Sequence, residues 1–343
     1  MNKKLFVSVI VCTYNGEKYI SDCLEALIRQ NYPRNMYEII VVDDGSSDNT
    51  SEIVSTYPVK LIKHKNNLGT YTSRNTGLRN ANGEIVAYTD DDCIPDESWI
   101  KNLIKPYVHD DVIAVGGMTE SFSYNTITEK YMAEAGYGNP SPIEFARSKN
   151  PLYRFYVYLE NMFSPVTSMS KPYVEVSAIY TLNASFRKFT LEQLGGWDEN
   201  LRFGGDTEMC MRIHEKLIGG KIIFTHRAKV IHKHRLSFIK FLKDMLLRNG
   251  DRIKYYLKYN EIPPIFPFPL FIIFITSVLG SYSVVNGLLS LIILPHIFYI
   301  WWPMKIIRKP KFYYLFFAYM QFSLELTAIL GMLRGFIRIK LKK

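Results

Sequence analysis

Three adjacent carboxylates, Asp90, Asp91 and Asp92, are the residues whose types and spacing point most directly to chemistry. Neighbouring carboxylates repel one another unless a cation lies between them. Such oxygen ligands suit Mg²⁺ or Mn²⁺, ions that commonly bridge phosphate oxygens. Because alternate residues of an extended segment share a face, we expect Asp90 and Asp92 to act together while Asp91 points away. The alternative is a solvated acidic turn.

Two other polar clusters, at residues 13–17 and 43–48, also follow apolar runs. Either Asp43 or Asp44 can accept a hydrogen bond from a nucleobase N–H while the other caps the following helix, or both are turn and cap residues. Arg74 lies in a predicted helix and can pair with a diphosphate, unless it is a surface arginine.

Later in the chain, a glycine-rich stretch precedes a predicted helix at residues 209–216 and contains Asp206. Helix capping alone would account for this acidic residue. Alternatively, a carboxylate beside an open site can deprotonate an acceptor hydroxyl. His232 and His234 follow a short predicted strand, and one of them is a candidate metal ligand, although two histidines alone are a weak signal.

The elements that must position these residues alternate between strand and helix. Four apolar runs predict strands, at residues 6–12, 38–42, 59–64 and 85–89. Helical spacing predicts three helices between them, at residues 17–30, 49–57 and 69–80. The alternation predicts parallel pairing with right-handed crossovers, which brings the polar clusters to the carboxyl ends of the strands, where ligands bind. The absence of GxGxxG and GxxxxGK[ST] argues against dinucleotide oxidoreductases and P-loop NTPases.

The net charge of +10 is distributed unevenly. Residues 1–232 carry a net charge of −3, residues 233–260 carry +6 and residues 262–343 carry +8. The mildly acidic first part argues against nucleic-acid binding. Four scattered cysteines without a CxxC pair argue against a disulfide scaffold and favour a reducing compartment.

The basic C-terminal third is also the most apolar part of the chain. Residues 262–304 include no Asp, Glu, Lys or Arg, and this length predicts two transmembrane helices, at 262–279 and 284–302, rather than a buried hairpin. If residues 1–261 are cytoplasmic, the hairpin returns the following lysines and arginines to the cytoplasm. We expect the third apolar stretch, 312–333, to be interfacial or partly embedded rather than a third span.

Six segments, taken in order, resemble the family 2 glycosyltransferases of GT-A fold: VSVIVCTYNGEKYI, EIIVVDDGSSDNT, NLGTYTSRNTG, TDDDCIP, LGGWDENL and GGDTEMCMRI. The resemblance covers about residues 5–235. It implies an α/β nucleotide-diphospho-sugar transferase fold around a mostly parallel sheet, to which this chain adds C-terminal transmembrane helices. We therefore expect four parts: a catalytic domain (1–235), a basic juxtamembrane segment (236–261), a transmembrane hairpin (262–304), and a third apolar helix with a basic tail (305–343).

The resemblance also assigns roles to particular residues. It implies nucleotide-sugar binding by Thr13, Tyr14, Asn15, Glu17, Asp43, Asp44, Arg74, Asp90 and Asp91. It implies divalent-metal binding by Asp92, with Asp90 and His232 beside it, and favours His232 over His234.

For catalysis the resemblance implies Asp206 as general base and Trp197 near the acceptor sugar. The Glu that usually precedes this Asp in the family is replaced by Gly205, which puts Glu208 forward as a substitute for contact with the acceptor.

The expected function is inverting sugar transfer from a nucleotide-diphosphate donor to a hydroxyl of a lipid-linked saccharide, with Mg²⁺ or Mn²⁺, at the cytoplasmic face of the cell membrane. Nucleotide sugar, lipid-linked glycan and membrane lipids are the expected partners. Two alternatives remain open. A polyprenyl-phosphate acceptor is already ionised and needs no base, whereas a non-catalytic membrane scaffold would be expected to lose a metal or base carboxylate, and this chain keeps both.

Overall fold

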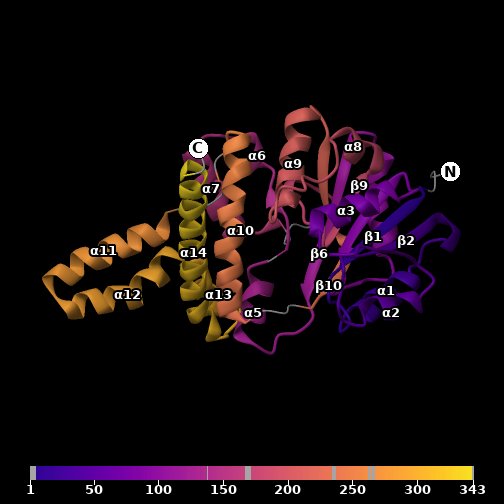
Figure 1. The fold of residues 1–343 in the computed structure, drawn as a ribbon. Helices are drawn as coiled ribbons and strands as arrows, with labels where there is room; N and C mark the ends of the chain where they lie inside the picture. The colour runs from indigo at the N-terminus through magenta and orange to yellow at the C-terminus, as the bar shows by residue number, and fades with distance from the viewer. Residues whose placement is uncertain are drawn as a thin grey trace. The chain divides into compact units, whose positions relative to one another are not determined.

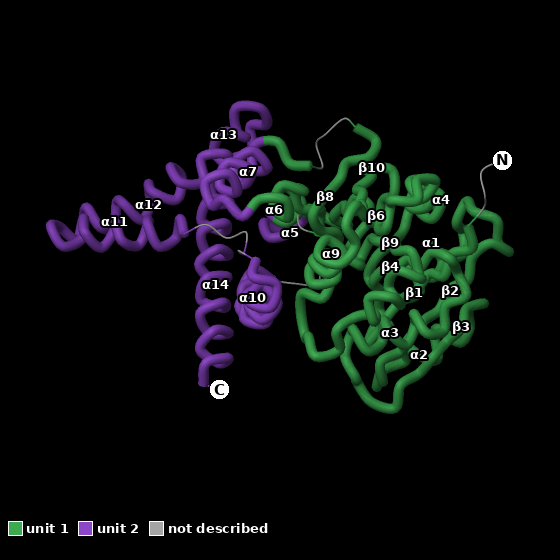
Figure 2. The backbone as a smooth tube through the Cα atoms, turned by 90° about the horizontal axis from the view of Figure 1, so that it is seen from above, with its two compact units in different colours: residues 1–124, 132–148, 164–234 green, residues 125–131, 149–163, 235–343 purple. Residues whose placement is uncertain are grey.

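The computed structural model describes residues 5–136, 138–166, 171–233, 237–261, 263 and 267–341. The chain divides into two compact units (Figure 2). The sheet unit comprises residues 1–124, 132–148 and 164–234, and the helical unit comprises residues 125–131, 149–163 and 235–343. The predicted domain of residues 1–235 therefore lacks two segments of its middle part, which fold with the C-terminal helices instead.

The sheet unit is built on one ten-stranded sheet with the order β3-β2-β1-β4-β9-β6-β10-β8-β7, and β5 pairs with β10 (Figure 1). The strands are β1 Val7–Thr13, β2 Tyr37–Asp43, β3 Lys60–Lys63, β4 Ile85–Asp90, β5 Cys93–Pro95, β6 Val112–Ser121, β7 Ser141–Pro142, β8 Val174–Ala178, β9 Asn183–Arg187 and β10 Lys221–His232. The four strands predicted from the sequence, β1 to β4, pair in parallel. Beyond them β9 runs antiparallel to both β4 and β6, so the complete sheet is mixed.

Helices connect and cover these strands. They are α1 Ile20–Ile28, α2 Thr50–Ser55, α3 Thr70–Arg79, α4 Trp99–Ile104, α6 Glu144–Arg147, α8 Lys188–Gln193 and α9 Gly205–Lys216, with short 3₁₀ helices η1 Arg34–Met36 and η2 Lys105–Val108. The alternation of side chains along β1 separates two faces. Val9 packs with Leu24 of α1 in the main core, whereas Ile10 lies against Gly77 of α3.

The helical unit consists of α7 Pro151–Phe163, α10 Phe238–Lys258, α11 Phe268–Tyr282, α12 Val284–Phe298, α13 Trp301–Arg308 and α14 Tyr313–Leu341. The first part of α5 Ile127–Glu134 also belongs to it. Within this unit α10 lies along α14, and α11 and α12 form a hairpin that extends away from α14 (Figure 1).

The predicted spans correspond to α11 and α12, but their lengths differ from the expectation. Each has 15 residues, about 22 Å of helix, against about 30 Å of bilayer hydrocarbon. Among the described residues, α14 is the one unbroken helix that is long and apolar enough to cross a membrane. A second would follow only if α12 and α13, bent by 66°, formed one broken span.

Candidate active site

The polar clusters that the sequence separates meet at the carboxyl edge of the parallel strands. In the strand register, Thr13 of β1 lies opposite Asp43 of β2, and Cys12 lies opposite Asp90 of β4. The expected convergence at one edge is therefore present in the fold.

Asn15 and Glu17 join the loop after β1 to the loop after β2. Asn15 adopts a left-handed conformation with φ of 52°, and its side-chain oxygen accepts the Ser47 N–H at 2.9 Å. The Glu17 carboxylate accepts the Asn49 N–H at 3.2 Å. Tyr14, which directly precedes Asn15 in the sequence, keeps 49% of its surface exposed. The paired loops thus present an open aromatic ring at this edge.

Asp43 and Asp44 are buried and already hold protein groups. Asp43 accepts a hydrogen bond from the Ser51 hydroxyl of α2. Asp44 accepts the Gly69 N–H at 2.8 Å, just before α3, and its other oxygen lies 2.8 Å from His64 Nδ1. Each carboxylate therefore positions a loop, and a nucleobase contact would use a remaining lone pair.

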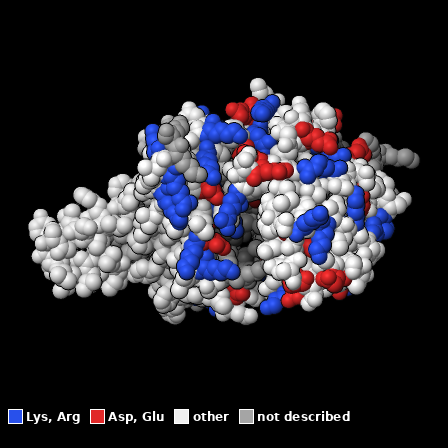
Figure 3. All heavy atoms as spheres, in the orientation of Figure 1, with Lys and Arg blue, Asp and Glu red and all other residues white. Residues whose placement is uncertain are grey.

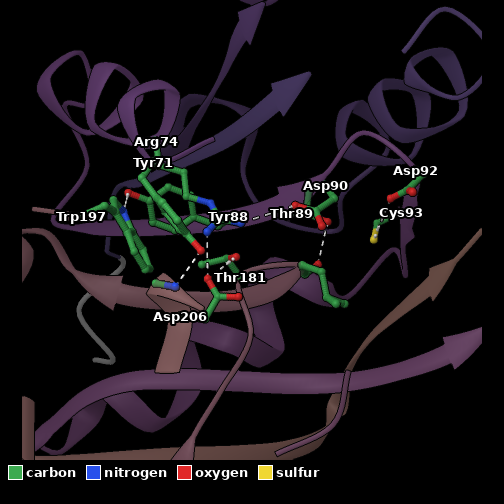
Figure 4. Close-up of polar contacts among 12 residues, drawn as sticks. Tyr71, Arg74, Tyr88, Thr89, Asp90, Asp92, Cys93, Thr181, Trp197 and Asp206 are labelled. Carbon is green, nitrogen blue, oxygen red and sulfur yellow. Dashed lines mark hydrogen bonds and ion pairs between the residues drawn. The ribbon is translucent and has the colours of Figure 1, made fainter. Parts of the chain in front are cut away.

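The three adjacent carboxylates point in three directions (Figure 4 labels two of them). Asp91 accepts a hydrogen bond from Thr13 at 2.6 Å. Asp90 turns toward Arg74, with 3.9 Å between the carboxylate and the guanidinium. Asp92 lies instead beside His232, with 3.4 Å between Oδ1 and Nε2. The expected pairing of Asp90 with Asp92 is thus replaced by a pairing of Asp92 with the histidine.

Strand pairing explains how His232 reaches this place. β5 runs antiparallel to β10, with His232 opposite Cys93. The ligand atoms of Asp92, Cys93 and His232 lie within 4.8 Å of one another, and burial raises the pKa of the Cys93 thiol well above its usual value. A carboxylate oxygen and an imidazole nitrogen at this spacing fit a divalent cation. His234 lies outside the described residues.

Asp90 and Arg74 form the electrostatic centre of the site. Burial raises the pKa of Asp90 to about 6, although 42% of its side chain stays exposed; Arg74 opposes this shift and the Asp92 charge adds to it. Burial alone would lower the pKa of Arg74, but the charges of Asp206 and Asp90 outweigh it and raise that pKa. Arg74 therefore stays cationic between two carboxylates.

Two aromatic rings hold the Arg74 guanidinium in place. Its central carbon lies 5.3 Å from the centroid of the Tyr71 ring and 5.2 Å from that of the Trp197 ring. Trp197 is 2% exposed and donates its indole N–H to the Tyr88 hydroxyl at 3.1 Å. Cation–π contacts of this kind fix a cation that must remain partly desolvated.

Asp206 lies in the first turn of α9. The helix starts at residue 205, earlier than predicted, because Gly204 adopts a left-handed φ of 81°. One carboxylate oxygen, Oδ1, accepts hydrogen bonds from Arg74 at 2.8 Å and from the Thr181 hydroxyl at 2.9 Å (Figure 4). The side chain is 21% exposed. Sequence reasoning missed Thr181, because no motif or periodicity marks it.

The contact between Gly205 and Tyr71 explains why position 205 has no room for a side chain. Its N–H donates to the Tyr71 hydroxyl at 2.6 Å, and a Cβ at this position would lie 2.4 Å from the Tyr71 ring. The glutamate that the resemblance leads one to expect here would collide with that ring.

The two predicted acceptor contacts lie elsewhere than expected. The Glu208 side chain is 1% exposed and pairs with Arg212 at 2.7 Å, because the two residues are one helical turn apart in α9. This ion pair stays in the interior and offers no surface to an acceptor. Trp197 is likewise buried and supports Arg74 instead.

Comparisons with known proteins show which proteins this chain resembles. The family model described as Glycosyl transferase family 2 matches residues 8–169. Glycosyltransferase AglE of Haloferax volcanii is 37% identical over 238 residues, which are 67% of this chain and 67% of AglE. A glucosyl-dolichyl phosphate glucuronosyltransferase of the same organism is 27% identical over 241 residues, 66% of this chain and 69% of that enzyme.

A solved structure shows the same fold. The mannosyltransferase PcManGT from Pyrobaculum calidifontis, determined with GDP-Man and Mn²⁺, superimposes with a TM-score of 0.63. The comparison covers 97% of this chain and 88% of PcManGT at 21% sequence identity. At that identity the likeness establishes the GT-A fold.

Proposed function

This chain belongs to glycosyltransferase family 2, and from that premise we propose that it transfers a sugar, with inversion, from a nucleotide-diphosphate donor to a hydroxyl of a lipid-linked saccharide. The observation that carries the proposal is the Asp206 carboxylate, fixed at one oxygen by Arg74 and Thr181 and partly open to solvent.

The donor is assigned to the carboxyl edge of the parallel strands. Tyr14 offers an exposed ring to the nucleoside, and Arg74 offers a guanidinium to the diphosphate. Asp92 and His232 would hold the divalent cation, for which their oxygen and nitrogen donors suit Mn²⁺ or Mg²⁺. When bound, this ion would offset negative charge on the leaving diphosphate.

Asp206 then acts as general base. As the acceptor oxygen bonds to the anomeric carbon, its proton passes to the Asp206 carboxylate. The bond from that carbon to the donor phosphate breaks, and its electron pair leaves with the nucleotide diphosphate. Attack from the face opposite the leaving group inverts the anomeric centre without a covalent enzyme intermediate.

A saccharide acceptor is supported by two features. The Haloferax glucuronosyltransferase is named for its action on glucosyl-dolichyl phosphate, a sugar that is carried on dolichyl phosphate. A positioned base is required for a neutral sugar hydroxyl, whereas a polyprenyl phosphate is already ionised. The alternative is a polyprenyl-phosphate sugar synthase. Such an enzyme would keep its activity when the Asp206 carboxylate is removed.

The test combines a donor panel with one substitution. Purified full-length protein is incubated with nucleotide sugars, Mn²⁺ or Mg²⁺, and polyprenyl-linked saccharide or polyprenyl phosphate, and nucleotide diphosphate release is measured. We expect Asp206→Asn to lower transfer by about 10²- to 10⁴-fold while donor binding persists. Asp110→Asn, at a fully exposed position, is the control. Near-normal turnover of Asp206→Asn would remove the base assignment and favour the phosphate acceptor.

We further propose that the α11–α12 hairpin attaches the protein to the cytoplasmic face of the membrane. Residues 262–304 carry no charged side chain, and the hairpin surface shows none in Figure 3. Its large apolar side chains are exposed, among them Leu270, Phe274, Val284, Leu288 and Ile292. An apolar surface of this extent is expected to be covered by lipid.

The position of α14 favours a different role for that helix. Its midpoint is joined to the inserted segments of the helical unit, because Tyr131 of α5 donates to Gln321 and Tyr158 of α7 donates to Glu325 at 2.5 Å. Its second half packs along α10, which carries six Lys or Arg residues and two Asp residues. Burying those charges in hydrocarbon would be costly. We therefore propose that α14 is a core helix of its unit and not a span.

A further inference from the structure

We propose that Thr181 is a positioning residue that orients the Asp206 carboxylate for proton abstraction. The inference rests on the proposed role of Asp206 as general base and adds a residue that neither the sequence motifs nor the comparisons assign.

The first observation is that the two donors share one oxygen. Thr181 Oγ1 and Arg74 Nη1 lie 2.9 Å and 2.8 Å from Asp206 Oδ1 (Figure 4). Two donors from different elements fix the rotation of the carboxylate about its last torsion, which is otherwise broad. With Oδ1 engaged, the proton acceptor is Oδ2, held in one direction before the substrate arrives.

The second observation is that Thr181 is on a rigid support. It lies in the tight turn between β8 and β9, which the Asn183 N–H closes by donating to the Tyr180 carbonyl at 3.0 Å. The Leu182 carbonyl in this turn accepts a hydrogen bond from Thr89, at 3.0 Å, next to the acidic cluster. The turn is thereby tied to the end of β4.

Asn183 fixes the same turn from its other side. Its side-chain amide donates to the carbonyls of Met118 at 2.8 Å and Ala228 at 3.0 Å, and its side-chain oxygen accepts the Trp99 indole N–H at 2.8 Å. Asn183 is 2% exposed. A hydroxyl presented from such a turn is preorganised, as groups that orient catalytic residues must be.

Thr181 differs from Arg74 because its replacement should affect Asp206 without affecting donor binding. Arg74 also faces Asp90, so its replacement would disturb the diphosphate site together with the base. The Thr181 hydroxyl bonds to Asp206, and the residue is 1% exposed, which leaves no surface for direct contact with either substrate. Its loss should therefore lower kcat and leave both KM values unchanged.

The experiment compares Thr181→Val, which keeps the side-chain shape, with Thr181→Ser, which keeps the hydroxyl. Initial rates are measured on the full-length protein with the donor and acceptor found active above. We expect Thr181→Val to lower kcat roughly ten- to a hundredfold, the range for loss of a hydrogen bond to a charged group, and Thr181→Ser to restore at least half of the activity. Donor affinity and thermal midpoint should stay those of the unaltered protein.

Thr190→Val in α8 is the matched control, because this threonine is also buried in the sheet unit, whereas the hydrogen bonds of the Asp206 carboxylate come from Arg74 and Thr181. Thr181→Ala provides a second variant without the hydroxyl, should valine disturb folding, and the same loss of kcat is expected. Normal kcat in both variants, a loss that serine fails to restore, or a change confined to acceptor KM would each overturn the positioning role. If Asp206→Asn is inactive, those results would contradict only the positioning role of Thr181 and not the proposed function. If Asp206→Asn is active, both the positioning role and the proposed base-assisted transfer to a sugar hydroxyl would be contradicted.

Discussion

At the scale of single residues, the site departs from the family pattern at position 205, where a neighbouring ring leaves no room for a side chain. Tyr71 occupies the volume that a side chain at position 205 would need, and its hydroxyl accepts the Gly205 N–H. The same ring also lies against Arg74. One aromatic residue thus contacts both Gly205 and Arg74, the two neighbours of the base, and its ring leaves no space for a second acid at position 205.

This explanation predicts that restoring a side chain at position 205 is harmful. We expect Gly205→Ala to destabilise the protein by about 1–3 kcal/mol, as overpacking commonly does, and to lower transfer activity. Unfolding in urea measures the first effect and nucleotide diphosphate release the second. In the background of Tyr71→Ala, which removes the ring, the added cost of Gly205→Ala should largely vanish. Equal costs in both backgrounds would contradict the packing explanation.

At the scale of elements, two helices of the helical unit approach each other closely through glycines. A Cβ on Gly335 of α14 would lie 2.1 Å from the carbonyl oxygen of Gly250 in α10, and one on Gly331 would lie 2.5 Å from that of Leu246. Small residues at a crossing let two backbones touch, and here they allow α10 to lie along the second half of α14.

We therefore expect Gly335→Ala to destabilise the helical unit, although alanine favours a helix by about 1 kcal/mol over glycine. The added carbon must push α10 and α14 apart, and the lost packing along both helices should exceed that gain. Gly280→Ala in α11 is the matched control, because its Cβ would lie 3.7 Å from the nearest atom. Thermal unfolding in mild detergent compares the two variants, and a Gly335→Ala protein as stable as the control would refute the close crossing.

At the scale of the whole molecule, the net charge of +10 is concentrated in the residues of the helical unit, beside an uncharged hairpin. In Figure 3, Lys and Arg side chains gather over α10 and α14, and the surface of α11 and α12 is bare of charge. An apolar hairpin next to a basic surface suits a membrane with anionic lipid, where each nearby Lys or Arg contributes about 1 kcal/mol.

This distribution predicts how the protein behaves with lipid vesicles. We expect it to float with vesicles containing phosphatidylglycerol, and the double variant Leu288→Lys, Ile292→Lys on the exposed face of α12 to float at least tenfold less, because lysines within hydrocarbon are costly. Val108→Lys, at a 70% exposed apolar position of the sheet unit, is the control. Unchanged flotation of the double variant would place the membrane contact elsewhere.

Much of this protein was predictable from local sequence. The apolar runs of β1 to β4, the polar residues that end them, and the placement of Asp206 at the start of a helix follow from periodicity and turn chemistry, which act over a few residues. The uneven charge and the uncharged stretch of residues 262–304 likewise required no structure. The family motifs then supplied the activity, because they preserve the order of these local features.

Tertiary structure alone decided which of these residues meet. Thr181 is 25 positions from Asp206 in sequence and carries no motif, yet a turn between two strands brings its hydroxyl to the carboxylate. Glu208, which the family resemblance put forward for acceptor contact, lies in the interior because it pairs with Arg212 one helical turn away. The inserted segments 125–131 and 149–163 join the C-terminal helices through side chains far apart in the chain. Such contacts depend on packing between distant segments, and local patterns record only what each segment does by itself.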